Sequence, residues 1–263
     1  MTHAARPTRS LAHDPADWLP ASVITGGVVL AMVPFVISLP LPVLVALWLT
    51  SIAARSIAPI HHHFHAHYKI FRGVTANAVY DFVLMLAAGH ITAVWELQHV
   101  HGHHRRYLTP EADPADIGRF GHAGRWQRAI YTLLGDAASF TDSLAIARAA
   151  RARWLPRLWR QQLVQIAVMI ALVVANPLLA VVFVIVPNVL LRWTVFWVAY
   201  AHHHEVPLTD VYSGSVTSLG WANRFYLNVG HHTAHHEKPT LHWSRLPART
   251  AQIMTRIPSA CLR

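Results

Sequence analysis

Residues 21–54 read ASVITGGVVLAMVPFVISLPLPVLVALWLTSIAA, an almost uninterrupted apolar block. A hydrocarbon core of about 30 Å is crossed by roughly 20 helical residues, so this block is too long for one span. Pro34, Pro40 and Pro42 interrupt it, and prolines end or bend helices. The block therefore predicts two spans, residues 21–38 and 41–57, which turn around residues 39–42.

A second long apolar block covers residues 163–200. Asn176 and Pro177 form a turn signal near its middle, which predicts two more spans, residues 162–175 and 178–200. Residues 73–97 are only moderately apolar, and an interfacial or re-entrant helical element is expected there. The predicted fold class is an all-α integral membrane protein, with four transmembrane helices in two hairpins and a cytoplasmic helical cap.

The composition agrees with a membrane protein, because 54% of the 263 residues are hydrophobic and only 13% are charged. Lys and Arg outnumber Asp and Glu by 22 to 12, and arginines gather between the apolar blocks, notably in residues 119–160. The positive-inside rule places such segments in the cytoplasm, whereas nucleic acid is a poor partner for them. Docking of an acidic electron donor or acyl carrier is an alternative use of this Arg-rich segment. The single cysteine, Cys261, excludes an internal disulfide and a CxxC motif.

The chain is expected to form one membrane domain, residues 20–250. Residues 1–19 lack a small-residue cleavage site, so we interpret them as a cytoplasmic tail before a retained anchor. Residues 251–263 are predicted to be a C-terminal tail, and both termini are expected in the cytoplasm.

Most of the 21 histidines lie in four clusters, at residues 61–67, 99–104, 202–204 and 231–236. All four clusters lie on the cytoplasmic side of the expected topology, so they can converge in space. His63 and His67 are four residues apart, as are His99 and His103, and this spacing places each pair on one face of a helix. Imidazole suits iron, zinc or copper, and eight or nine histidines exceed the ligand number of one ion. A pair of irons that activates O₂ is the most economical interpretation, with zinc hydrolysis as an alternative.

These clusters resemble the three histidine boxes of the membrane fatty-acid desaturase and hydroxylase superfamily, written HxxxH, HxxHH or HxxxHH, and HxxHH. The sequence has HFHAH at residues 63–67, HVHGHH at residues 99–104 and HTAHH at residues 232–236. YAHH at residues 200–203 resembles a further family histidine, for which we choose His203 with His202 as the fallback. The resemblance covers roughly residues 20–250. It implies the metal ligands His63, His67, His99, His103, His104, His203, His232, His235 and His236.

Several assignments stay open at this point. A register of the first box that uses His61 and His65 is conceivable, although His63 and His67 are preferred because Phe71 then follows the box as in the family. Flanking polar residues could act as weaker ligands or orient an imidazole. They are Asn228, Asp210 and Glu237, with Glu96, Asp113 and Asp116 as further acidic candidates. The remaining clustered histidines are expected to support ligands or face solvent: His62, His65, His101, His204 and His231.

The resemblance implies an O₂-dependent di-iron oxidoreductase of a bacterial inner membrane, with its active site in the cytoplasm. Fatty-acyl desaturation is the expected reaction, since the third box continues to Pro239 and His242–Trp243 much as in bacterial acyl desaturases. Hydroxylation of a fatty-acyl, alkane or carotenoid chain is the alternative, and a metal transporter or metal-binding membrane protein is a distant one. The expected partners are a lipid or acyl-thioester substrate and a separate electron donor of the ferredoxin, rubredoxin or cytochrome b5 type.

Overall fold

The computed structural model describes residues 10–121, 124–150 and 154–263. Residues 1–9 of the predicted N-terminal tail, and residues 122–123 and 151–153 of the Arg-rich segment, lie outside the described residues. Every element in the described part of the chain is a helix. The longer helices are α1 Trp18–Met32, α2 Leu41–Arg55, α3 Ala58–His67, α4 Val74–Ala88, α7 Gln127–Ala149, α8 Leu155–Ala175, α10 Val186–His203 and α12 Leu246–Ile253.

Short helical segments connect these helices. Two of them are π-helices, η3 Trp95–His103 and η7 Ala180–Ile185. The short α-helices are α5 Thr92–Val94, α6 His104–Arg106, α9 Pro177–Leu179 and α11 His232–Glu237. The 3-10 turns are η1 Pro15–Asp17, η2 Val33–Phe35, η4 Pro110–Ala112, η5 Ile117–Phe120, η6 Gly124–Trp126, η8 Trp221–Arg224, η9 Trp243–Arg245, η10 Met254–Arg256 and η11 Ser259–Cys261.

Four stretches of helix are long and apolar enough to cross a membrane, which confirms the predicted number. They are Pro15–Phe35, Leu41–His67, Leu155–Ala175 and Pro177–His203. Each extends beyond the span predicted from the sequence at one end or both. The extension has a consequence for the second and fourth stretches, because they end in α3 and α10 and so carry histidine clusters at their ends.

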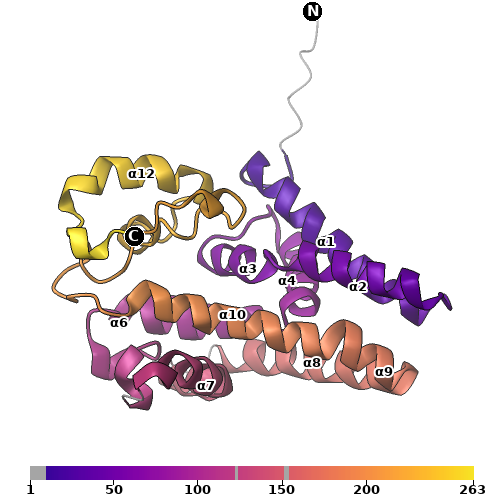
Figure 1. The fold of residues 1–263 in the computed structure, drawn as a ribbon. Coiled ribbons are helices and arrows are strands. Elements are labelled where there is room, and N and C mark those ends of the chain that lie inside the picture. The colour runs from indigo at the N-terminus through magenta and orange to yellow at the C-terminus, as the bar shows by residue number, and fades with distance from the viewer. Residues whose placement is uncertain (1–9, 122–123, 151–153) are drawn as a thin grey trace, which may run out of the picture.

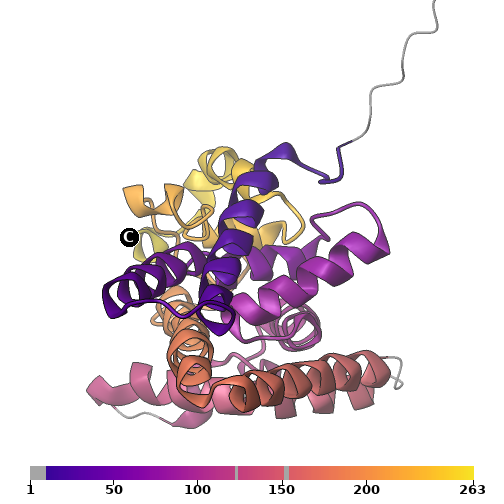
Figure 2. The same ribbon diagram turned by 90° about the vertical axis from the view of Figure 1, so that its right-hand side faces the viewer.

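The ends of these helices remote from the histidines pack on one another. Ala31, Trp48 and Phe183 belong to one apolar cluster there, and the Trp48 indole donates a hydrogen bond to the carbonyl of Val182. Asn176 separates α8 from α9, and its side chain accepts a hydrogen bond from the backbone N–H of Leu179. Figure 1 shows this end of the molecule at the right, and Figure 2 looks onto it.

The segment between the two pairs of spans is bent. The stretches Val74–Ala88 and Thr92–Arg106 meet at 92°, the geometry of a broken span or a re-entrant loop. Gly89 occupies the bend with a φ of 74°, a backbone conformation that favours glycine, and lies too close to Asn188 for a Cβ to fit. The bend brings η3 back toward α3, so that the second histidine cluster approaches the first.

The last residues of the chain, 251–263, pack into the molecule. Ile253, Ile257 and Cys261 are buried in a core that also contains Phe64 of α3. Thr217 exchanges backbone hydrogen bonds with Cys261 and Arg263. In Figure 1 this C-terminal segment, drawn in yellow, lies at the end of the molecule opposite α9.

Candidate metal centre

Histidines from all four sequence clusters converge where the long helices α3 and α10 end. Their ring nitrogens form two groups, and within each group the candidate ligand atoms lie within 4.8 Å of one another. The first histidine group contains His63, His67, His99, His104 and His235. The second histidine group contains His103, His203 and His236.

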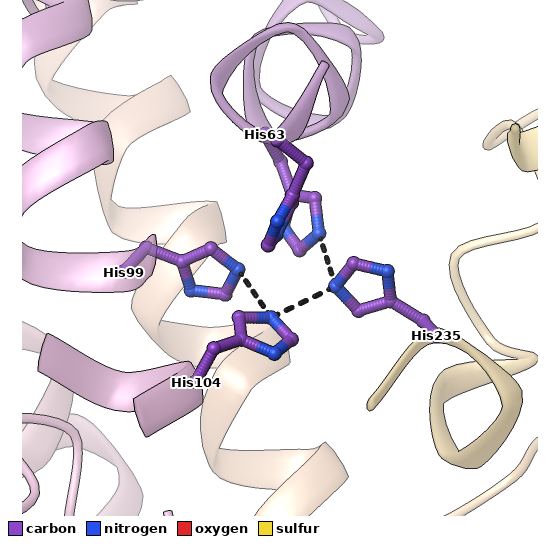
Figure 3. A group of neighbouring side chains, drawn as sticks. His63, His99, His104 and His235 are labelled. Carbon is purple, nitrogen blue, oxygen red and sulfur yellow. Dashed lines mark hydrogen bonds between the residues drawn. The ribbon is translucent and has the colours of Figure 1, made fainter. Parts of the chain in front are cut away.

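In the first histidine group, Nε2 atoms from four elements, α3, η3, α6 and α11, point toward one another. His235 Nε2 of α11 lies 2.8 Å from His63 Nε2 of α3 and 3.0 Å from His104 Nε2 (Figure 3). His104 Nε2 lies 3.1 Å from His99 Nε2. His67 completes the group with a buried Nε2 that has no hydrogen-bond partner in the described part of the chain.

The second histidine group joins η3, α10 and α11. The rings of His103, His203 and His236 lie with centroids 4.7 to 5.0 Å apart. His232, the ninth nominated histidine, adjoins this group because its Nε2 lies 3.1 Å from His203 Nε2 and 3.2 Å from His236 Nε2. His202 instead stacks on the ring of His232, with ring centroids 4.0 Å apart.

The two groups are neighbours. His104 of the first group stacks on His236 of the second, with ring centroids 4.4 Å apart. Two ions held in these groups would therefore be neighbours, as expected of a dinuclear site.

Hydrogen bonding alone does not account for this arrangement. A ring nitrogen of a neutral imidazole can donate or accept one hydrogen bond, so His235 Nε2, which faces the Nε2 atoms of both His63 and His104, cannot pair with both. The opposite Nδ1 atoms of His104, His232, His235 and His236 are also buried without a partner among the described residues. A cation that accepts the converging lone pairs resolves the conflict, and an all-imidazole donor set fits iron, zinc or copper. The residues present thus fit a pair of transition-metal ions.

The protonation state of the third box agrees with metal binding. Burial lowers the pKa of His232, His235 and His236 well below the ordinary value, and repulsion from neighbouring histidines lowers it further. These side chains are therefore neutral near pH 7, which is the form that binds a metal.

Two of the nominated ligands form a hydrogen bond through Nδ1, the ring nitrogen that faces away from the metal site. His103 Nδ1 donates to Asp113, with 2.8 Å between Nδ1 and Oδ2, and Asp113 is itself buried. His203 Nδ1 donates to the carbonyl of Gly214 at 3.1 Å. Such partners fix the ring orientation and leave Nε2 free for a metal.

The pairing of histidines along η3 differs from the α-helical spacing used in the sequence analysis. His99 shares a group with His104, five residues on, whereas His103 lies in the other group. The reason is that η3 is a π-helix, in which the N–H of His104 bonds to the carbonyl of His99. Its wider turn brings positions five apart onto one side.

The alternative register of the first box places its histidines elsewhere. His61 Nδ1 lies 2.6 Å from the Tyr80 hydroxyl, and its Nε2 lies 3.2 Å from Asp17. His65 Nε2 lies 2.9 Å from Asp81. Both side chains are buried and bonded to carboxylates rather than gathered with the other histidines.

The polar residues nominated as weaker ligands also bond elsewhere. Asn228, with a φ of 57°, donates from its side chain to the carbonyl of Trp243. Asp210 accepts from the backbone of its own turn at Tyr212 and Ser213. Glu237 pairs with Arg249.

A partly buried charged network beside the first two boxes was only partly predicted from the sequence. Asp81 accepts from Thr92 as well as from His65, and Lys69 lies 2.8 Å from Glu96 and 3.6 Å from Asp81. Arg157 of α8 also pairs with Glu96. Asp81 and Asp17 were not nominated because they lie far from the boxes along the chain, and only the contact with a box histidine reveals them.

A largely apolar cavity of about 430 Å³ adjoins both histidine groups. His63 and His99 line it from the first group, and His103 and His203 from the second. Much of the apolar part of its wall comes from α10, with Leu191, Val195, Phe196, Val198 and Ala199. An apolar lining of this kind favours a hydrocarbon ligand.

Comparison with known proteins is consistent with this geometry. A family model described as fatty acid desaturase matches residues 15–263, a range that includes the four candidate spans and both histidine groups. No curated protein matches the chain.

Proposed function

We propose that this chain, which belongs to the fatty acid desaturase family, is a membrane oxidoreductase. It would use O₂ to introduce a double bond into a fatty-acyl chain. The observation that carries the proposal is the pair of buried histidine groups at the wall of an apolar cavity. Neither a transporter nor a passive metal-binding protein needs an acyl-sized cavity beside two metal sites.

Two iron ions, when bound by the two histidine groups, would supply the oxidation of a C–H bond with O₂. The side chains of the protein would position the substrate. The apolar wall of α10 would hold an extended chain and exclude water, while the histidines lining the cavity would keep one carbon next to the metals. The position of that carbon along the cavity would set regioselectivity.

The electrons would come from a separate carrier of the ferredoxin, rubredoxin or cytochrome b5 type. Exposed arginines on the histidine side, such as Arg105, Arg106 and Arg148, give an acidic carrier a complementary surface. The excess of arginine between the spans also supports a cytoplasmic site in a bacterial inner membrane.

The first experiment is metal analysis of the purified protein. We expect about two irons per chain, because the imidazoles form two groups, each able to hold one ion. A protein with no bound transition metal after expression in iron-rich medium would contradict the proposal.

The second experiment is mass analysis of lipids from cells that express the protein. Loss of two hydrogens from acyl chains is the expected result, and gain of an oxygen would assign the hydroxylase alternative. His235→Ala should abolish the product, because His235 contacts two other members of the first histidine group. His231→Ala is the matched control, since this half-buried neighbour bonds to Thr250 and should leave product formation intact.

A further inference from the structure

Residues 219–226 present large apolar side chains outward. Leu219 is 50% exposed, Trp221 77%, Phe225 64% and Tyr226 44%. We call this segment, which contains η8, the aromatic loop. A soluble surface rarely gathers such side chains, and a patch of this kind marks a protein or membrane contact.

Hydrogen bonds to neighbouring residues fix the aromatic loop in its exposed position. The Asn223 side chain donates to the carbonyl of Ser218 at 2.6 Å and accepts from the N–H of Gly230 at 3.0 Å. Gly230 lies so close to Asn223 that a Cβ there would collide with the amide. The loop is thereby fixed to the residues just before the third histidine box.

The aromatic loop borders the cavity beside the metal centre. Ala222, Asn223 and Tyr226 line the cavity together with Pro59 and Ile60 of α3 and with α10. The loop thus forms part of the wall between the cavity and the outside of the protein.

Helix lengths place this part of the cavity at the edge of the hydrocarbon core. About 20 helical residues cross the core. When about 20 residues are counted along each span from the end remote from the histidines, the other edge of the core falls at Pro15, Ile60–His61, Leu155 and Trp197. Ile60 and Trp197 both line the cavity that the aromatic loop borders. A loop on the same cavity wall is therefore expected near the level where headgroups meet acyl chains.

Tryptophans of the spans support this boundary. Trp18, Trp159 and Trp197 lie near it and are 42% to 45% exposed, as expected for an aromatic belt. Arg128 stacks 4.0 Å over the ring of Trp197, and Arg224 is exposed within the aromatic loop itself. Arginines beside aromatic side chains suit a surface of lipid phosphates.

We propose that the aromatic loop inserts into the headgroup and acyl boundary of the bilayer. The mouth of the cavity then faces lipid, so a chain enters from the membrane rather than from water. This entry route rests on the proposed function, whereas the insertion of the loop does not.

The test places an environment-sensitive fluorophore on Trp221→Cys or Phe225→Cys in the full chain, reconstituted in lipid nanodiscs. We expect blue-shifted emission that spin-labelled lipid quenches and aqueous iodide does not. Leu49→Cys, on the exposed apolar face of α2, is the lipid-facing control, and Glu111→Cys, on an exposed turn, is the water-facing one. The unmutated chain, whose Cys261 is buried, gives the background labelling.

Iodide quenching at Trp221→Cys and Phe225→Cys equal to that at Glu111→Cys would show that the loop lies in water and would overturn the proposal. The measurement needs no turnover. If the protein binds iron and oxidises lipid while its loop is in water, only this inference is wrong. If the loop is inserted but the protein is inactive, only the proposed function is wrong.

Discussion

Among the nominated ligands, His103 has a buried carboxylate, Asp113, as its hydrogen-bond partner. Asp113→Asn keeps the shape of that partner but replaces the acceptor charge that orients His103. We expect the second histidine group to bind iron about 10- to 100-fold more weakly, in line with the loss of comparable supporting partners elsewhere. Iron titration of the metal-free protein measures this change. Asp116→Asn, at a half-buried carboxylate nearby, is the control and should bind iron as the unmutated protein does.

Arg55 is a buried cation among apolar helices. Its guanidinium donates to the carbonyls of Ala87 and Phe183 and to the side chain of Asn188, and so joins α2 to α4, η7 and α10. An ionisable side chain at this depth is costly unless each donor finds an acceptor.

Arg55→Met should therefore destabilise the fold by about 3 kcal/mol or more, because three buried acceptors lose their donor. Unfolding in mixed detergent micelles measures this loss. Arg160→Met, at an exposed arginine of α8, should change stability little, and equal effects of the two substitutions would show that the buried contacts are not what Arg55 contributes.

At the scale of the helix, η3 decides which histidines act together. Positions five apart on an α-helix differ by about 140° in direction, so His99 and His104 would diverge if this segment were α-helical. The π-helical turn brings them into one group and leaves His103 in the other.

Paired substitutions test this assignment. His99→Ala/His104→Ala removes two ligands from the first histidine group and should leave about half of the bound iron. His99→Ala/His103→Ala removes one ligand from each group and should weaken both sites alike. Iron content measured at matched protein concentration distinguishes the two patterns. Half occupancy in the second variant, with both sites weakened alike in the first, would restore the α-helical pairing.

The four spans and the four histidine clusters were predictable because each is a local property of the sequence. Spans depend on the hydropathy of about 20 consecutive residues, and the boxes on spacings within six residues. The π-helical pairing was not predictable, since it depends on contacts of η3 with its neighbours, such as the close approach of Gly102 to Pro114. The packing of residues 251–263 likewise depends on partners as distant as Phe64.

On the scale of the whole molecule, the metal centre is also where the C-terminal segment contacts the spans. The third box lies on α11, and its histidines meet ligands from α3, η3 and α10. Removal of the metals leaves converging buried imidazoles with unsatisfied nitrogens, so the metal-free fold should depend on pH.

The sign of that dependence follows from the lowered pKa values of His232, His235 and His236. In the unfolded chain these side chains take up protons as the pH falls through about 6.5, whereas the folded chain keeps them neutral. Their contribution to stability is therefore present above about pH 6.5 and is lost as the pH falls toward the folded pKa values. Chelator-treated protein should show a falling thermal midpoint between about pH 7 and about pH 5.

A variant with all three histidines changed to Gln separates this effect from acidification of the remaining protein. It keeps polar side chains on α11 but removes their titration, so its metal-free form should lose less stability over the same pH range. Iron-loaded unmutated protein should resist acid down to a lower pH, because protons must first displace the metal. Identical pH slopes for the metal-free unmutated and triple-variant proteins would place the acid sensitivity outside α11.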